Sequence, residues 1–144
     1  MMNIDTETIE KLIGTALEYR LRAYTPYSGY NVGAAALFED GSVTGGCNVE
    51  NAAYSPGICA ERNAIYKAVS EGHRKLKAIA VAGSPAGDEI SQYACPCGVC
   101  RQVMREFADP GECEIIVVGP AGEYRVHTLA ELLPESFGPD NLGK

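Results

Sequence analysis

The stretch VGAAALFEDGSVTGGCN, residues 32–48, decides the fold class of this chain. Two runs with the pattern of strands, residues 32–38 and 42–48, stand on either side of the dipeptide Asp40-Gly41. An Asp-Gly pair between two such runs is a strong signal for a β-hairpin, because both residues accept the backbone angles that a tight turn requires. The sequence therefore predicts an antiparallel pair of strands here, and helical patterns stand on both sides of it.

The rest of the chain alternates between helical and strand patterns. Residues 5–23 repeat apolar side chains at helical spacing after Asp5, a possible N-cap, and predict an amphipathic helix. The later elements expected, in order, are a helix over residues 59–71, a strand over 76–82, a helix over 98–108, and strands over 113–118 and 123–127. This order predicts an α/β protein, a three-layer α/β/α arrangement with a mixed five-stranded sheet. We expect residues 1–144 to form a single domain.

Composition and charge narrow the classes of function. Nineteen acidic against twelve basic residues give a net charge of −7, which repels a polyphosphate backbone and argues against a nucleic-acid partner. The apolar runs are far shorter than the ~20 residues of a membrane-spanning helix. Residues 1–5 have neither the basic start nor the apolar stretch of a secretory signal. We therefore expect a cytoplasmic protein without membrane contact that acts on a small, weakly charged molecule.

Cysteine spacing gives the most specific chemical signal. In a reducing compartment, six cysteines with four of them at positions 59, 95, 97 and 100 are more typical of metal ligands or redox groups than of disulfides. Cys59 precedes Glu61 by two residues, and Cys97 precedes Cys100 by three, a spacing that lets both sulfurs reach one ion. Both groups are expected at the start of a helix, where the positive end of the helix dipole favours thiolates over thiols.

These residues match the parts of a hydrolytic zinc site. Four cysteines would close a tetrahedral zinc, whereas three leave one position for water. Zinc lowers the pKa of a bound water from ~15.7 to about 7, and Glu61 is the candidate base that accepts the proton of that water. Three thiolates make the ion a poor Lewis acid, and Arg62 stands next to Glu61, where its positive charge would offset the excess. The pattern favours one catalytic zinc ion for each chain.

Two other interpretations of the cysteines remain open. Cys97 and Cys100 before a helix also suit a thioredoxin-like redox pair, although this interpretation leaves Cys59 and Glu61 without a role. Cys95 could instead complete a structural zinc site with four thiolates, which would make the chain an interaction module without catalysis.

The chain also resembles cytidine deaminases, the small enzymes that act on free nucleosides, along nearly its whole length. The motifs that carry the resemblance are Ala23-Tyr24, Pro26-Tyr27-Ser28, Val32-Gly33-Ala34-Ala35, Asp40-Gly41, Gly46-Cys47-Asn48-Val49-Glu50-Asn51-Ala52, Cys59-Ala60-Glu61-Arg62, Pro96-Cys97-Gly98-Val99-Cys100-Arg101-Gln102, Glu131-Leu132-Leu133-Pro134 and Phe137. The resemblance implies zinc-dependent hydrolysis of cytidine and 2′-deoxycytidine to the uridines in pyrimidine salvage, with release of ammonia. It also implies a homotetramer with shared active sites. A related deaminase with another substrate, such as blasticidin S, is the alternative.

The resemblance further implies roles for individual residues. Glu61 would move protons between water, the pyrimidine and the departing amine, with zinc on Cys59, Cys97 and Cys100. The residues expected to bind substrate are Tyr30, Asn48, Glu50, Ala60 and Phe137. Tyr30 stands where many members have a Phe lining the pyrimidine pocket, and Asn48 and Glu50 would hydrogen-bond the ribose 3′-hydroxyl. The backbone N–H of Ala60 would face the pyrimidine carbonyl, and Phe137 would reach into the site of a neighbouring subunit. Two departures from the family pattern, Cys95 for a common Ser and Val99 for a frequent Ala, bear on fine geometry rather than on reaction type.

Overall fold

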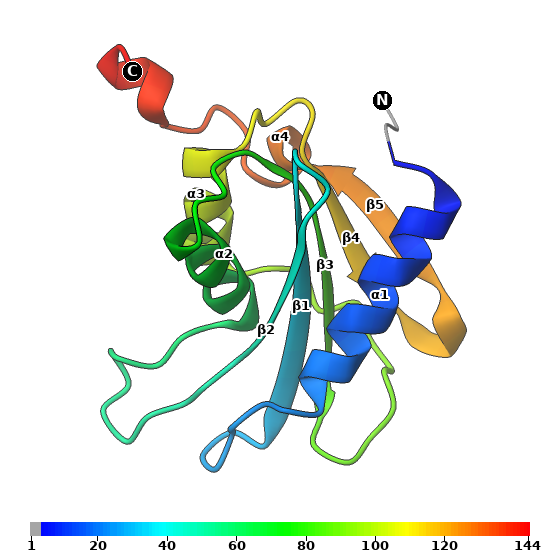
Figure 1. Ribbon diagram of the computed structural model, residues 1–144. Coiled ribbons are helices and arrows are strands. Elements are labelled where there is room, and N and C mark those ends of the chain that lie inside the picture. Colours follow the sequence, from blue (N-terminus) through cyan, green and yellow to red (C-terminus); the bar gives the residue numbers. More distant parts are fainter. Residues whose placement is uncertain (1–3) are drawn as a thin grey trace.

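The computed structural model describes residues 4–144, and in these residues a five-stranded sheet carries helices on both faces (Figure 1). The strands are β1 (Tyr30–Phe38), β2 (Val43–Cys47), β3 (Leu76–Pro85), β4 (Glu114–Val118) and β5 (Tyr124–Thr128). The helices are α1 (Thr6–Arg20), α2 (Ala60–Ser70), α3 (Gly98–Phe107) and α4 (Leu129–Leu132), with short 3₁₀ turns at Pro120–Gly122 and Pro139–Leu142. The order of strands and longer helices is the one predicted from the sequence.

The sheet is mixed, as expected. Its strand order is β2-β1-β3-β4-β5, and the β3/β4 pair is parallel whereas the other three pairs are antiparallel. The predicted hairpin is formed by β1 and β2, and its turn is closed by hydrogen bonds from the Gly41 N–H to the Phe38 carbonyl (2.9 Å) and from the Phe38 N–H to the Ser42 carbonyl (3.0 Å). The hairpin therefore forms one edge of the sheet, with β1 paired on both sides.

Side chains alternate between the two faces of the sheet and create two cores. On one face, Ala34, Ala36 and Ile79 pack with the buried residues of α2 and α3. On the other face, the intervening residues of the same strands pack against α1. This period of two is the signature of strands buried on both faces. Figure 1 shows α1 on one side of the sheet and α2 and α3 on the other, so the predicted three-layer α/β/α architecture is confirmed.

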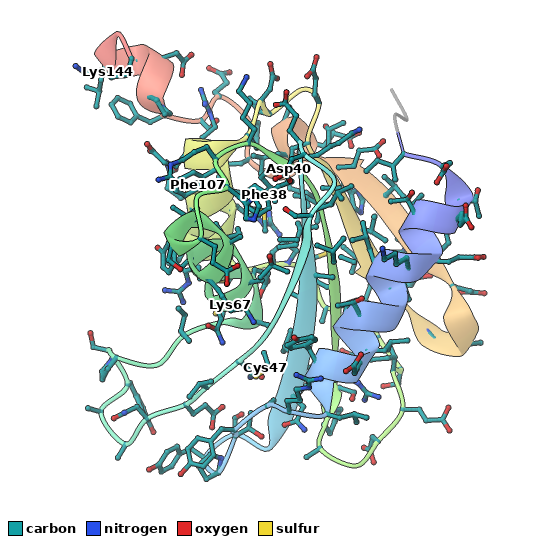
Figure 2. All side chains as sticks on the ribbon, in the orientation of Figure 1. Phe38, Asp40, Cys47, Lys67, Phe107 and Lys144 are labelled. Carbon is teal, nitrogen blue, oxygen red and sulfur yellow. The ribbon has the colours of Figure 1, made fainter. Side chains whose placement is uncertain are left out.

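The larger core lies between the sheet and the pair α2 and α3. Phe38, at the end of β1, is 1% exposed and is among its largest fully buried side chains. Phe107, at the end of α3, packs against the same core from the helix side (Figure 2). Burial of side chains of this size contributes about 1.5–3 kcal/mol each to the hydrophobic stabilisation. This core fixes α2 and α3 side by side on the sheet.

The two largest differences from the predicted boundaries, three residues each, arise because pairing with distant residues sets the ends of α1 and β3. α1 begins after Asp5, whose Oδ1 accepts the Thr8 N–H at 2.8 Å as an N-cap, but it ends at Arg20 instead of residue 23. The chain has to leave the helix there because Tyr24 pairs with the segment after β2, donating to the Asn48 carbonyl at 3.0 Å. β3 runs three residues beyond the expected end at 82, since its last residues pair with the start of β1.

None of the helices in the part of the chain described, residues 4–144, has the length and apolar character needed to cross a membrane.

Candidate metal centre and substrate cavity

Three cysteine sulfurs that are distant in the sequence meet at the N-terminal ends of two helices. The Sγ atoms of Cys59, Cys97 and Cys100 all lie within 4.8 Å of one another. Cys59 Sγ is 3.8 Å from Cys97 Sγ, which in turn is 3.5 Å from Cys100 Sγ. A tetrahedral zinc with Zn–S bonds of ~2.3 Å requires sulfurs about 3.8 Å apart. The three sulfurs therefore fit zinc closely.

Local backbone structure explains why the sulfurs converge. Cys59 is the N-cap residue of α2 and Cys97 is the N-cap residue of α3, and both have extended backbone angles. Neither side chain caps its own helix, so both sulfurs can face the same ion. Cys100 lies in the first turn of α3 and is fully buried. The positive ends of both helix dipoles thus meet at the sulfur cluster and favour negative charge there.

Arg62 supplies a second source of positive charge at the cluster. Its Nη2 donates to Cys59 Sγ at 3.3 Å. Hydrogen bonds from the Cys100 thiol and from Arg62 lower the pKa of Cys59 to about 5. The pKa of Cys100 is raised, because its proton is held in the hydrogen bond to the Cys59 sulfur and its side chain is buried. Arg62 thus lies beside the sulfur cluster, where its positive charge stabilises a thiolate.

The geometry separates the three interpretations of the cysteines. The exposed Cys95 is not one of the clustered ligands, so no site with four thiolates forms among the described residues 4–144. Cys97 and Cys100 are both free thiols, and their sulfurs are farther apart than the ~2.05 Å of a disulfide. The cluster uses Cys59 as well, which a redox pair would leave unexplained.

Glu61 lies in the first turn of α2, two residues after the metal-facing Cys59. It is one of few charged residues in the interior, with only 4% of its surface exposed. Burial removes water from the carboxylate and raises the pKa of Glu61 to about 7, and the charge of Cys59 acts in the same direction. A carboxyl group with such a pKa can accept or release a proton near neutral pH.

A cavity of about 460 Å³ opens beside the sulfur cluster. Its wall consists of Tyr27, Ser28, Asn48, Val49, Glu50, Asn51, Tyr54, Gly57, Ile58, Cys59 and Arg62. The volume falls within the range of ~300–1,000 Å³ that is typical of small-molecule sites. The segment after β2 therefore brings the predicted substrate residues Asn48 and Glu50 next to a metal ligand.

The carboxylate of Glu50 is held by the turn before β1. It accepts hydrogen bonds from the backbone N–H groups of Tyr27 and Ser28, both at 3.1 Å, and from the Ser28 hydroxyl. These bonds lower the pKa of Glu50, with the Ser28 hydroxyl as the first cause. The carboxylate is thus ionised and oriented at the cavity wall.

The side-chain amide of Asn48 hydrogen-bonds the backbone of β1, a structural role that the sequence did not specify. Its Oδ1 accepts the Val32 N–H at 2.9 Å, and its Nδ2 donates to the Tyr30 carbonyl at 2.9 Å. The amide thereby binds the end of β2 to β1 where the strand pairing ends. One amide hydrogen and one lone pair remain for a ligand.

The other predicted substrate residues lie outside the cavity wall. The Tyr30 ring packs against Gly83, where an added Cβ would lie 3.0 Å from both Tyr30 Cε2 and Ala94 Cβ. Ala60 is fully buried as the first residue of α2, where backbone N–H groups have no partner within the helix. Phe137 is 60% exposed and belongs to the C-terminal segment. One subunit therefore does not bring Phe137 to its own cavity.

Sequence reasoning assigned no role to several residues of the cavity. Tyr54 and Ile58 line it, and Ser28 orients Glu50. Ser28 is 22 residues from Glu50 in the chain, so spacing gives no sign of the contact. The only signal for Ser28 was its place in a motif shared with the family.

Comparison with known proteins agrees with this site. A family model described as the cytidine and deoxycytidylate deaminase zinc-binding region matches residues 6–116. The chain is 45% identical over 134 residues to a cytidine deaminase of Sporosarcina psychrophila, covering 93% of this chain and 94% of the relative. It is 40% identical over 131 residues to that of Mycobacterium tuberculosis, covering 91% and 90%. The crystal structure of cytidine deaminase from Burkholderia pseudomallei superimposes with a TM-score of 0.80 at 41% identity, covering 95% of this chain and 100% of that one.

Proposed function

The chain belongs to the family of zinc-binding cytidine and deoxycytidylate deaminases, and from this premise we propose that it hydrolyses cytidine and 2′-deoxycytidine to uridine and 2′-deoxyuridine, releasing ammonia. The single observation that carries the proposal is the cluster of three sulfurs, of which Cys59 lies in the wall of a cavity of about 460 Å³, with the buried Glu61 two residues after Cys59. Relatives at 40–45% identity over most of the chain carry the same name, cytidine deaminase.

Zinc is the cofactor that the family and the donor set support. Cys59, Cys97 and Cys100 would hold it, since their sulfur spacing matches tetrahedral Zn–S geometry. When bound, zinc supplies Lewis-acid activation, which lets water ionise near neutral pH. Arg62 and the two helix N-termini compensate the negative charge of the three thiolates.

Glu61 carries the proton transfers in this proposal. Its carboxylate takes a proton from the attacking water and delivers it to N3 of the pyrimidine, which makes C4 electrophilic. The oxygen of that water bonds to C4. Glu61 then takes the proton of the new C4 hydroxyl and passes it to the exocyclic amine, the C4–N bond breaks, ammonia leaves and the C4 carbonyl forms. Burial raises the pKa of Glu61 above the ordinary value of a carboxyl group, which favours proton uptake by Glu61. Each positioned transfer contributes roughly 10²–10⁴ in rate.

Substrate binding is proposed for the cavity. Glu50, oriented by Ser28, and the remaining hydrogen-bonding capacity of Asn48 would bind the ribose 3′-hydroxyl. Because an analogue without this hydroxyl would leave buried polar groups unpaired, a free base should be a poor substrate. The first N–H of α2, at Ala60, would face the pyrimidine carbonyl, and Tyr30 would pack near the ring.

We further propose that the protein acts as a homotetramer with shared sites, in which Phe137 reaches into the site of a neighbouring subunit. The cavity wall supports this, because Tyr27, Val49 and Tyr54 are 55%, 39% and 84% exposed. Large apolar side chains rimming a ligand cavity are typical of surfaces that a partner covers. The proposed setting is one domain over residues 1–144 that works in cytoplasmic pyrimidine salvage without a membrane or nucleic-acid partner.

The experiment follows the ultraviolet change of cytidine with the unmodified protein and with Glu61→Gln. We expect Glu61→Gln to lose at least ~10²-fold in kcat, since it removes more than one proton transfer, while zinc is retained. Glu71→Gln, at the exposed end of the same helix, is the matched control and should keep its activity. Full turnover in Glu61→Gln would refute the proton-transfer role, and turnover of blasticidin S but not of cytidine would refute the substrate.

A further inference from the structure

α3 has two groups of polar contacts at different positions along its length. Its N-terminal end carries Cys97 and Cys100 of the sulfur cluster. Its later turns contact the C-terminal segment, residues 133–144, which follows α4 and runs outward past α3 to the end of the chain (Figure 1). The segment contains Phe137. One helix, α3, therefore contacts both the metal site of its own subunit and the segment whose aromatic side chain is proposed to enter the site of a neighbouring subunit.

Two side chains of α3 hold the chain around Phe137, Gln102 through a backbone carbonyl and Arg105 through the side chains of Ser136 and Asp140. Gln102 Nε2 donates to the Phe137 carbonyl at 2.8 Å. Arg105 donates through Nε to the Ser136 hydroxyl at 2.8 Å and through Nη2 to Asp140 Oδ1 at 2.6 Å. The bonds from Arg105 thus fix the chain on both sides of Phe137, while the bond from Gln102 fixes the residue itself.

Burial distinguishes Arg105 from an ordinary surface arginine. The residue is 9% exposed, whereas the side chain of its partner Asp140 is 72% exposed. The guanidinium lies under the C-terminal segment, so close that a Cβ added at Gly138 would be 2.3 Å from Cζ and Nη1. Gly138 therefore permits the contact. The planar guanidinium offers donors in fixed directions, which a lysine ammonium cannot reproduce.

We propose that Arg105 is a positioning residue for the active site of the neighbouring subunit. By binding the side chains of Ser136 and Asp140 it fixes the chain on both sides of Phe137, so that the exposed ring is held outward in a defined place. This inference rests on the proposed function, specifically on the entry of Phe137 into a neighbour's site. A ring held in place before the nucleoside binds loses less conformational freedom on binding, so the effect belongs to substrate affinity. Arg105 touches no reacting atom, and proton transfer does not depend on it.

The test is a double-mutant cycle on the zinc-loaded oligomer, with Arg105→Lys, Phe137→Ala and their combination. Loss of one or two hydrogen bonds should raise the KM for cytidine about 3–10-fold in Arg105→Lys. We expect kcat, zinc content and oligomer size to be unchanged. In the Phe137→Ala background the same change should raise KM no further, because the ring through which Arg105 acts is absent. Glu106→Gln, the exposed next residue of α3, is the matched control and should leave KM unchanged.

Each outcome supports or overturns the proposal. An equal rise of KM in both backgrounds would mean that Arg105 acts independently of Phe137 and would overturn it. If Phe137→Ala raises KM but Arg105→Lys does not, the positioning role is wrong and the shared site stands. If Phe137→Ala leaves KM unchanged in an intact oligomer, the shared site is wrong and this inference is overturned with it. If Arg105→Lys fails to fold, Ser136→Ala replaces it in the cycle. This variant removes one of the two hydrogen bonds of Arg105, and the same results would support or overturn the proposal.

Discussion

Gly46→Ala is the substitution that connects the packing of the sheet with the chemistry of the site. Gly46 is buried in β2 and faces α2, the helix that begins after Cys59 and contains Glu61. A Cβ at this position would lie 2.5 Å from Ala64 N, 2.7 Å from the Ala60 carbonyl oxygen and 2.9 Å from Ala64 Cα. All three are backbone atoms of a helix and cannot turn aside. Since carbon contacts need about 3.5 Å, α2 has to move away from β2 by roughly 1 Å.

The displacement determines the expected size of the effect. Overpacking of this kind typically costs about 1–3 kcal/mol of folding free energy. For a chain of about this length each kcal/mol lowers Tm by roughly 2–4 °C. Because α2 carries the proposed proton-transfer group, a displacement of about 1 Å should lower kcat/KM for cytidine by ~10²-fold. The loss of activity should therefore be much larger than the fraction of unfolded protein explains.

The measurement combines thermal unfolding with kcat/KM at a temperature where every variant is folded. Gly45→Ala is the matched control, because its Cβ would point to the other face of the sheet and meet the Tyr19 ring, 2.2 Å from Cε1. Tyr19 is half-buried and can rotate away, so stability should fall while turnover is kept. Unchanged kcat/KM in Gly46→Ala, or the same loss in Gly45→Ala, would refute the reasoning that α2 transmits the displacement to the site.

Three further outcomes are expected. Ser28→Ala should raise the KM for cytidine several-fold without changing kcat. The Ser28 hydroxyl also helps hold the pKa of Glu50 below its ordinary value, so in the variant Glu50 should become protonated, and KM should begin to rise, at a higher pH as the solution is acidified. Steady-state kinetics between pH 4 and 8 will show both effects. Gly14→Ala should raise the free energy of unfolding by about 0.5–1 kcal/mol in urea titrations, because Gly14 is inside α1 and an added Cβ meets no atom within 4 Å. In the zinc-loaded protein, iodoacetamide at pH 8 should label the exposed Cys95 first and leave Cys113 unmodified, because burial raises the pKa of Cys113 to about 12. Mass spectrometry of peptides will give the order, and early labelling of Cys113 would contradict its buried position.

Most of the fold is predictable because local patterns and packing agree. Asp40-Gly41 marks the turn of the β1/β2 hairpin, and the apolar period of residues 5–23 predicts α1. α2 and α3 lie where helices are expected over residues 59–71 and 98–108. The ends of α1 and β3 are not predictable, since contacts with residues distant in the chain set them. α4 is too short for periodicity to reveal, although Thr128 and Glu131 form a capping box that marks its start.

The metal ligands are predictable for a different reason. Zinc chemistry limits the possible donors, so Cys59, Cys97 and Cys100 are recognisable from residue type, spacing and position at helix starts. The contacts of polar side chains at the cavity are less predictable. Asn48 uses its amide to bridge to β1, and Ser28 orients Glu50 across 22 residues of sequence. Such contacts depend on where the turn before β1 meets the segment after β2, which local pattern does not encode.

The central claim is that three sulfurs, and not a fourth, hold the zinc that the reaction needs. Zinc content and turnover of cytidine should be measured together on the unmodified protein and on Cys59→Ala, Cys97→Ala, Cys100→Ala and Cys95→Ala. The account predicts about one zinc for each chain in the unmodified protein and in Cys95→Ala, with turnover kept in both, and loss of zinc and turnover in the other three variants. Loss of zinc from Cys95→Ala, or full turnover by protein free of zinc, would contradict it.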